Sequence, residues 1–164
     1  MGDYGALGAI LALSAIAFLF FAVIFLAFWV LKSIGLYTLA SNRGIENPWL
    51  AWIPIADLYI MGLLVGEMDI LDYHLDNLGL WCPVIFVSGS ILSGIPFVGT
   101  LVSIAWFIFA LYFLYKVFEI YTPQAVLYTV LSIIPGLFAI FLFLIRNNQP
   151  LNGKGPSAQP PASY

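Results

Sequence analysis

The loop Glu67–Gly79 gathers the side chains of this sequence that are best suited to bind a cation. Asp72, His74 and Asp76 stand at alternate positions, so they would share one face of an extended segment. Divalent cations such as Ca²⁺ take about six to eight oxygen ligands, but this spacing matches no established metal loop. We interpret the segment as a solvated acidic loop. A divalent-cation site at these three residues, or a site for a basic partner, is the alternative.

Asp57 is a second candidate, because it is an ionisable residue within an apolar segment. An ionised carboxylate is costly at membrane depth, so such a residue often marks a functional site. Pro54 breaks the same segment, and transporters use broken helices to hold ions. Asp57 and Glu67 could therefore form a polar pathway. The alternative is that Trp52 and Tyr59 place Asp57 at the headgroup level, where its charge costs little.

Pairs of small residues four positions apart recur in the apolar segments. Such pairs let two helices approach closely, either inside one bundle or between a bundle and a partner. They involve Gly62, Gly66, Gly89, Ser90, Ser93 and Gly94. The first apolar run has a similar series at Gly5, Gly8, Ala12, Ala15 and Ala22. We expect all of these to be helix-packing residues, with contacts inside the bundle as the simpler case.

Residue types for catalysis are sparse. The chain has one histidine and one cysteine, and neither stands in a nucleophile–base arrangement or beside a phosphate-binding glycine loop. Cys82 is interpreted as a buried, inert thiol, with lipid attachment as the alternative. Five Lys and Arg residues in total do not support nucleic-acid binding. We therefore expect a non-enzymatic protein without a cofactor.

The composition requires a lipid environment. Of the 164 residues, 63% are hydrophobic and 8% are charged, whereas soluble proteins carry about 25% charged residues. A transmembrane helix needs about 20 apolar residues, and the apolar segments lie at about 6–38, 48–66, 80–95, 97–118 and 124–145. The predicted fold is an all-α, polytopic transmembrane bundle over residues 1–145, with four to five membrane-embedded helices, one short and proline-broken. Residues 146–164 are predicted to be a disordered Pro/Gly-rich tail.

Prolines mark the expected breaks. Asn47 followed by Pro48 predicts a helix start. Pro54 interrupts the segment that follows, which could span the membrane, dip in and return, or lie at its surface. Pro135 and Gly136 predict a kink in the last apolar segment. Ile-Pro dipeptides begin at Ile53, Ile95 and Ile134, but their flanking residues do not match, so no internal repeat is inferred.

Basic residues indicate the orientation. Lys32 and Arg43 follow the first apolar run, and the positive-inside rule places that side in the cytoplasm. If segment 48–66 spans, Arg146 also falls inside and Lys116 falls outside, so charge favours five spans. A re-entrant pair over residues 49–95 would place the tail on the same side. Lys116 and Glu119, three positions apart, are expected to pair at the membrane surface.

Two stretches, residues 41–66 and 111–150, carry a family resemblance. The first contains Asn42-Arg43-Gly44 and then Trp-Leu-Ala-Trp-Ile-Pro-Ile at 49–55, and the second contains Phe-Leu-Ile-Arg-Asn at 143–147. These motifs resemble a family of small multi-spanning bacterial membrane proteins, common in Gram-positive genomes, with no established activity. The resemblance implies a multi-pass protein of the inner (cytoplasmic) cell membrane and no particular reaction.

The sequence favours a function through protein contacts in the bilayer. Small-residue faces suit lateral helix contacts, and catalytic groups are sparse. We expect an accessory, scaffold or assembly subunit that associates with itself or with another membrane protein. The alternative is a small ion or solute channel or transporter with a polar pathway at Asp57 and Glu67.

Overall fold

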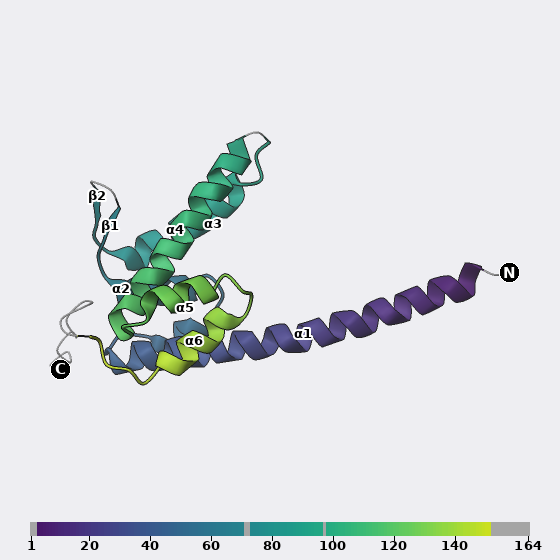
Figure 1. Cartoon of the computed structure of the whole chain (residues 1–164), viewed down its shortest axis with the longest axis horizontal. Helices are drawn as coiled ribbons and strands as arrows, with labels where there is room; N and C mark the ends of the chain where they lie inside the picture. The colour runs from purple at the N-terminus through teal and green to yellow at the C-terminus, as the bar shows by residue number, and fades with distance from the viewer. Residues whose placement is uncertain (1–2, 71–72, 97, 152–164) are drawn as a thin grey trace.

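The described part of the protein is helical apart from one short β-hairpin. The computed structural model describes residues 3–70, 73–96 and 98–151, and Figure 1 shows a long first helix leading away from a group of shorter ones. The helices are α1 (Asp3–Asn42), the 3-10 helix η1 (Pro48–Trp52), α2 (Ala56–Val65), α3 (Leu78–Leu92), α4 (Val98–Tyr121), α5 (Ala125–Leu131) and α6 (Leu137–Ile145). Strands β1 (Met68–Ile70) and β2 (Tyr73–Leu75) pair antiparallel between α2 and α3.

Helix α1 is longer than a bilayer crossing requires. Its 40 residues extend about 60 Å at about 1.5 Å per residue, against a hydrocarbon thickness of about 30 Å. Its N-terminal half stands away from the other helices (Figure 1), while Leu36 and Leu39 near its C-terminus are buried. The helix continues past the predicted end at residue 38. Leu7–Asn42 and Val98–Tyr121 are the two helices, among the described residues, that are long and apolar enough to cross a membrane.

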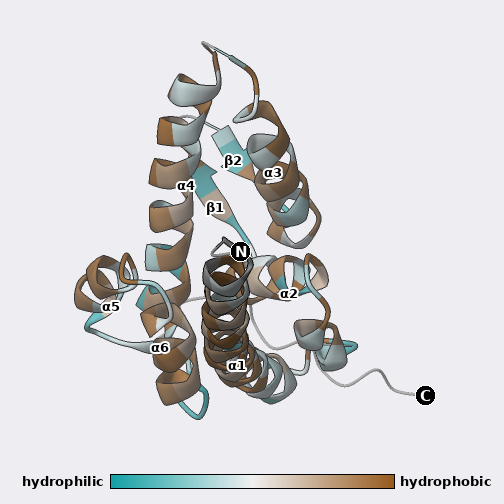
Figure 2. Ribbon diagram, turned by 90° about the vertical axis from the view of Figure 1, so that its right-hand side faces the viewer, coloured by the Kyte–Doolittle hydropathy of each residue, from teal (hydrophilic) through white to brown (hydrophobic). Residues whose placement is uncertain are grey.

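The buried core lies at the C-terminal ends of α1 and α4. We call this end the base, and it comprises Lys32–Asn42, α2, α5, α6 and Phe113–Tyr121. Figure 2 shows α1 end-on, with α2 on one side and α5 and α6 on the other. Helices cross closely here, because a Cβ at Gly35 would lie 2.7 Å from the Leu142 backbone carbon. A Cβ at Gly62 would collide with the Leu78 carbonyl oxygen of α3.

The predicted segment 48–66 is two short helices. η1 ends at Trp52 and α2 begins at Ala56, since Pro54 cannot donate a backbone hydrogen bond and Ile55 takes a positive φ of 75°. Pro48 opens η1 after Asn47, as predicted, but the Asn47 side chain makes no capping hydrogen bond. The 10 residues of α2 extend about 15 Å, too short to cross a bilayer. The break therefore falls at Pro54, where the sequence analysis expected it.

The predicted segment 124–145 is wrong as one kinked helix. α5 ends at Leu131 and α6 begins at Leu137, because Pro135 interrupts the hydrogen-bond ladder and Gly136 adopts a φ of 91°. A Cβ on Gly136 would lie 2.6 Å from the Phe28 ring, so this turn packs directly against α1. The Asn42 side chain donates to the Arg146 carbonyl at 3.2 Å, which brings the chain after α6 back to the end of α1.

Helices α3 and α4 form a longer hairpin that projects from the base (Figure 1). Trp106 of α4 lies against Gly89 of α3, and its indole donates to the Phe86 carbonyl at 3.3 Å. α3 begins two residues before the predicted position 80 and ends at Leu92. All three Ile-Pro dipeptides, at Ile53, Ile95 and Ile134, thus lie in the turns between paired helices.

The predicted tail is partly held by the base. The Asn148 side chain donates to the Tyr121 carbonyl at 3.0 Å, and the Leu151 backbone N–H donates to the Ile120 carbonyl at 2.7 Å. Residues 152–164 lie outside the described part. The all-α class is observed, whereas the four to five membrane-embedded helices stay a prediction.

Candidate functional site

Asp57 is held in the base by a charged partner that the sequence analysis did not identify. Its carboxylate pairs with the Lys32 ammonium of α1, and the Leu58 backbone N–H donates to it at 2.9 Å. The Asp57 side chain is 9% exposed and that of Lys32 20%. Beside the pair, the Trp29 and Trp52 rings meet edge to face at 5.8 Å. An ion pair and an aromatic contact therefore fasten the η1–α2 hairpin to α1.

A sequence signal for this pair did exist. Lys32 directly follows a charge-free run in an apolar helix, and Asp57 is the only charged residue of α2. A buried charge without a partner costs several kcal/mol, so opposite charges in apolar segments are expected to meet. The spacing along the chain could not say that α2 folds back beside α1.

Glu67 does not join Asp57 in one polar cluster. Asp57 lies in the first turn of α2, and Glu67 follows the Gly66 cap at its other end. The length of α2 puts about 15 Å between them. The two residues predicted for a polar pathway are therefore separated by the buried residues of α2, including Ile60 and Leu64.

The acidic loop folds as the β-hairpin, with His74 at the centre of three carboxylates. His74 Nδ1 lies 2.5 Å from Asp69 Oδ1, and its Nε2 lies 3.1 Å from Asp76 Oδ1 and 3.6 Å from Glu67 Oε2. The hydrogen bond with Asp69 raises the pKa of His74 above 6.5, and the nearby carboxylates add to the effect. All four side chains are exposed. A protonated His74 thus compensates part of the acidic charge of this loop.

Two of the predicted metal ligands, His74 and Asp76, lie close together. Ligand atoms of Glu67, His74 and Asp76 lie within 4.8 Å of one another, which is a separation that a bound cation could bridge. Asp72 lies outside the described residues. Glu67, which the sequence analysis did not include among the ligands, joins His74 and Asp76 in the described cluster.

The predicted small-residue positions have several different roles. Gly62 contacts α3 and Gly89 contacts Trp106, while Gly66 ends α2 with a φ of 81°. The Ser90 and Ser93 hydroxyls donate to carbonyls of Phe86 and Ser90 within their own helix turn. Gly94 lies in the turn after α3, where an added Cβ would lie 3.3 Å from the Ile91 carbonyl oxygen. Gly5 and Gly8 differ, because nothing lies within 4 Å of a Cβ at either position.

Two further predicted features are seen in the structure. Cys82 is fully buried in α3. Lys116 Nζ lies 3.3 Å from Glu119 Oε2, so the predicted pair on α4 is present.

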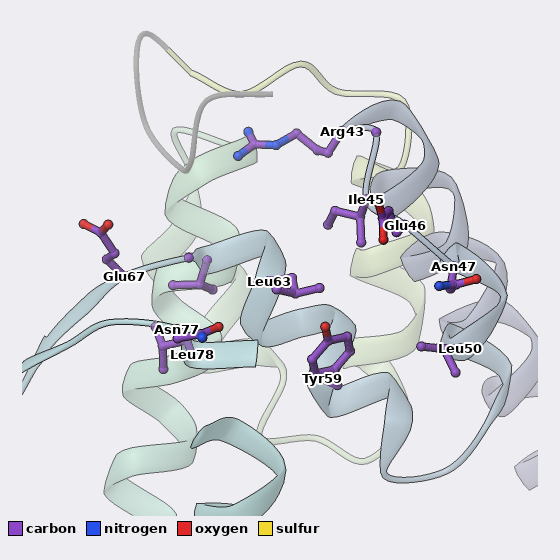
Figure 3. A pocket seen from close by; sticks show the side chains of 13 residues that line it. Arg43, Ile45, Glu46, Asn47, Leu50, Tyr59, Leu63, Glu67, Asn77 and Leu78 are labelled. Carbon is purple, nitrogen blue, oxygen red and sulfur yellow. The ribbon is translucent and has the colours of Figure 1, made fainter. Parts of the chain in front are cut away.

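A large polar cavity is the feature that sequence reasoning missed altogether. It has a volume of about 1050 Å³ and lies where the chain leaves α1 and where α2 meets α3 (Figure 3). Its lining consists of Arg43, Gly44, Ile45, Glu46, Asn47, Leu50, Tyr59, Leu63, Val65, Gly66, Glu67, Asn77 and Leu78. Two separate turns build it, so no single motif in the sequence could reveal it.

Left-handed backbone concentrates at this cavity. Gly44, Asn47, Gly66 and Asn77 all line it and all have positive φ, between 57° and 81°. The two asparagines adopt a conformation that asparagine tolerates better than most residues. Such conformations cluster at functional sites, where the surrounding structure holds them in place.

No family model matches this sequence, and neither a curated protein nor a solved structure matches it. The resemblance based on the motifs at 42–55 and 143–147 therefore stays a prediction. Over the described residues, the fold defines a mainly helical protein with two helices of membrane-crossing length and apolarity.

Proposed function

We propose that this chain is an integral membrane protein that acts through lateral contacts of α1, as an accessory, scaffold or assembly subunit. One observation carries the proposal: every side chain from Leu11 to Val23 is exposed, and this stretch carries no charge. So large an apolar surface is not left in water. Lipid or a partner helix covers it in the cell membrane.

The small residues of α1 favour a protein partner on one face. A Cβ at Gly5 or Gly8 would meet nothing within 4 Å, so the protein itself does not use these close-approach positions. Ala12 and Ala15 continue the same face. In lipid, faces of small residues let two backbones approach and gain van der Waals contact. A second helix, from another copy or another protein, fits this face.

The charges support one orientation for the proposed membrane protein. Lys32, Arg43, Lys116 and Arg146 all belong to the base or to its edge, where Asn42 bonds to the Arg146 carbonyl. By the positive-inside rule the base faces the cytoplasm. In this arrangement α1 and the α3–α4 hairpin enter the bilayer from the base. Helices α2, α5 and α6 belong to the base, so in this arrangement neither the η1–α2 nor the α5–α6 hairpin crosses the bilayer.

The alternative function, an ion or solute pathway at Asp57 and Glu67, has less support. Lys32 neutralises Asp57, and the buried side chains of α2 separate it from Glu67. A pathway would require the ion pair to open and the helix to move.

Purification of the intact protein from its native membrane in mild detergent tests the proposal. We expect a stoichiometric complex, with a second protein or with further copies of this chain, whose mass falls to that of a single chain in the variant Gly8→Leu/Ala12→Leu. These bulkier side chains obstruct close helix approach, while the space around Gly8 leaves the internal packing unchanged.

Phe21→Leu is the matched control, because Phe21 lies on the opposite face of α1 from Ala12 by helical spacing. It should leave the complex intact. A single-chain particle from the wild type, or a complex that survives Gly8→Leu/Ala12→Leu, would contradict the lateral-contact function. A closed homo-oligomer insensitive to these α1 variants would favour the channel.

A further inference from the structure

The two faces of the β-hairpin β1–β2 carry different kinds of side chain. The strands pair Asp69 with His74, and the same register, continued toward the helices, sets Glu67 opposite Asp76. Successive side chains of a strand point to opposite faces, so these four side chains share one face, which we call the polar face. Met68, Ile70, Tyr73 and Leu75 share the other face.

The hairpin is fixed to the helices from its apolar face and its backbone. Met68 is 2% exposed, and Ile70 packs against the buried core. The Tyr112 hydroxyl of α4 donates to the Asp69 carbonyl at 3.1 Å. All four side chains of the polar face remain exposed, so they are held in place and are accessible to an ion from solution.

Three ligand atoms converge on the polar face. His74 Nε2 lies 3.1 Å from Asp76 Oδ1 and 3.6 Å from Glu67 Oε2, and the ligand atoms of all three residues lie within 4.8 Å of one another. An ion about 2.1 Å from each ligand atom requires separations of about 3.0–3.4 Å between them. A small movement of the exposed Glu67 side chain therefore completes a three-ligand site.

Asp69 orients the imidazole for this role. Its Oδ1 lies 2.5 Å from His74 Nδ1, and a carboxylate accepts hydrogen bonds, so Nδ1 is the donor. The other nitrogen, Nε2, is thereby turned toward Glu67 and Asp76. Metal-binding histidines commonly bond their second ring nitrogen to a carboxylate in the same way. This oriented nitrogen distinguishes the hairpin from a simple group of acidic side chains.

The charge of the polar face favours a dication. Glu67 and Asp76 lie opposite each other, and like charges in that position destabilise a strand pair. A protonated His74 supplies one positive charge against the three carboxylates of the face. A dication at Nε2 would take the place of that proton and supply a second positive charge.

The ligand types select the class of ion. Ca²⁺ and Mg²⁺ are bound by oxygen ligands, whereas imidazole suits Zn²⁺ and other first-row transition-metal ions. One nitrogen and two carboxylate ligands, with water in the remaining position, make up a known kind of zinc site.

We propose that the polar face of the β-hairpin binds one Zn²⁺ or a similar divalent transition-metal ion. Glu67, Asp76 and the Nε2 atom of His74 are the ligands, and water completes the coordination. Asp69 is a positioning residue, because it acts on the ion through His74. The site does not depend on the lateral contacts of α1.

Titration of Zn²⁺ into the untagged, full-length protein in detergent micelles tests the proposal. A chelator first removes any bound metal, and calorimetry then gives the Kd and the stoichiometry for Zn²⁺, Mg²⁺ and Ca²⁺. We expect one Zn²⁺ per chain, bound at least about tenfold more tightly than Mg²⁺ or Ca²⁺, because of the imidazole ligand. The absence of saturable Zn²⁺ binding, or equal binding of the three ions, would overturn the proposal.

Variants of the polar face locate the ion. His74→Ala should weaken Zn²⁺ binding at least about tenfold, because it removes the one nitrogen ligand of the site, and Asp76→Asn should also weaken it. Circular dichroism should show an unchanged helix content in both. Glu46→Gln is the matched control, because Glu46 is an exposed carboxylate outside the cluster, and it should leave the Kd unchanged. Equal weakening by His74→Ala and Glu46→Gln would show attraction to general negative charge and contradict the site.

A second readout tests the positioning role of Asp69. Asp69→Ala should weaken Zn²⁺ binding by about tenfold and leave the stoichiometry at one ion per chain. In the wild type, ¹⁵N NMR of the His74 ring should show Zn²⁺ at Nε2 and a hydrogen at Nδ1. Zn²⁺ at Nδ1, or an unchanged Kd in Asp69→Ala, would contradict this role.

Discussion

Two short helical hairpins flank α1. They have similar turns but contact α1 through different interactions. η1–α2 and α5–α6 both reverse at an Ile-Pro dipeptide, at Ile53 and Ile134. The first is held to α1 by the Lys32–Asp57 ion pair. The second is held by apolar contact, with Gly136 directly against the Phe28 ring.

The two hairpins share the same backbone turn, a proline next to a residue with positive φ, but pack against α1 in different ways. A proline ends each helix by removing a backbone hydrogen bond, and a positive φ follows, at Ile55 and at Gly136. Isoleucine in that conformation is strained, and the Lys32–Asp57 ion pair two residues further on holds the hairpin against α1. Glycine is not strained there, so α5–α6 needs no such polar fastening. We expect the stability of η1–α2 to depend on the Lys32–Asp57 ion pair and that of α5–α6 to depend on close packing at Gly136.

Breaking the ion pair should have the largest effect. Lys32→Met leaves the Asp57 carboxylate without its partner and should lower the free energy of unfolding by about 3 kcal/mol, as for other buried pairs that lose one member. The measurement is reversible unfolding in mixed micelles by dodecyl sulfate titration. The double variant Lys32→Met/Asp57→Leu should recover most of this loss. Equal destabilisation by the double and single variants would show that the pair does not hold the hairpin.

Filling the turn of the second hairpin should have a smaller effect. Gly136→Ala introduces a Cβ at positive φ beside Phe28 and should lower the free energy of unfolding by about 2 kcal/mol. Phe28→Ala in the same chain should relieve the contact but leave the backbone strain. Gly8→Ala is the control, because open space and a regular helix there predict a slight stabilisation. No difference between Gly136→Ala and Gly8→Ala would refute the tight contact.

The smallest expected effect is on the charged β-hairpin. It comes directly after η1–α2 in the chain, and α5–α6 has no such hairpin after it in the described residues. By NMR titration, His74 should show a pKa above 6.5, because protonated His74 bonds to Asp69. Asp69→Asn should bring this pKa back toward 6.5. A raised folded-state pKa means that the contribution to stability is present below pH 6.5 and is lost as the pH rises through the folded pKa. A wild-type pKa at or below 6.5 would contradict the cluster.

The sequence predicted the two hairpins only in part. Pro54 and Pro135 identify the breaks, because a proline cannot continue the hydrogen-bond ladder. The hydropathy of segments 48–66 and 124–145 is the same whether the chain crosses the bilayer or folds back. Hydropathy therefore could not predict that each segment is a hairpin. Asp57 could be recognised from its apolar surroundings. Its partner Lys32 and the cavity depend on which helices become neighbours.

We propose that both short hairpins have their two ends on the base side, so that these ends lie on one side of the membrane. Single cysteines at Glu46, Glu67, Glu119 and Arg146, in a Cys82→Ala background, can be labelled with a membrane-impermeant maleimide in vesicles of each orientation. We expect all four cysteines to react from the cytoplasmic side, which is the side of Lys32 and Arg43. Labelling of Glu67 or Glu119 from the opposite side, as a bundle of five continuous spans requires, would contradict it.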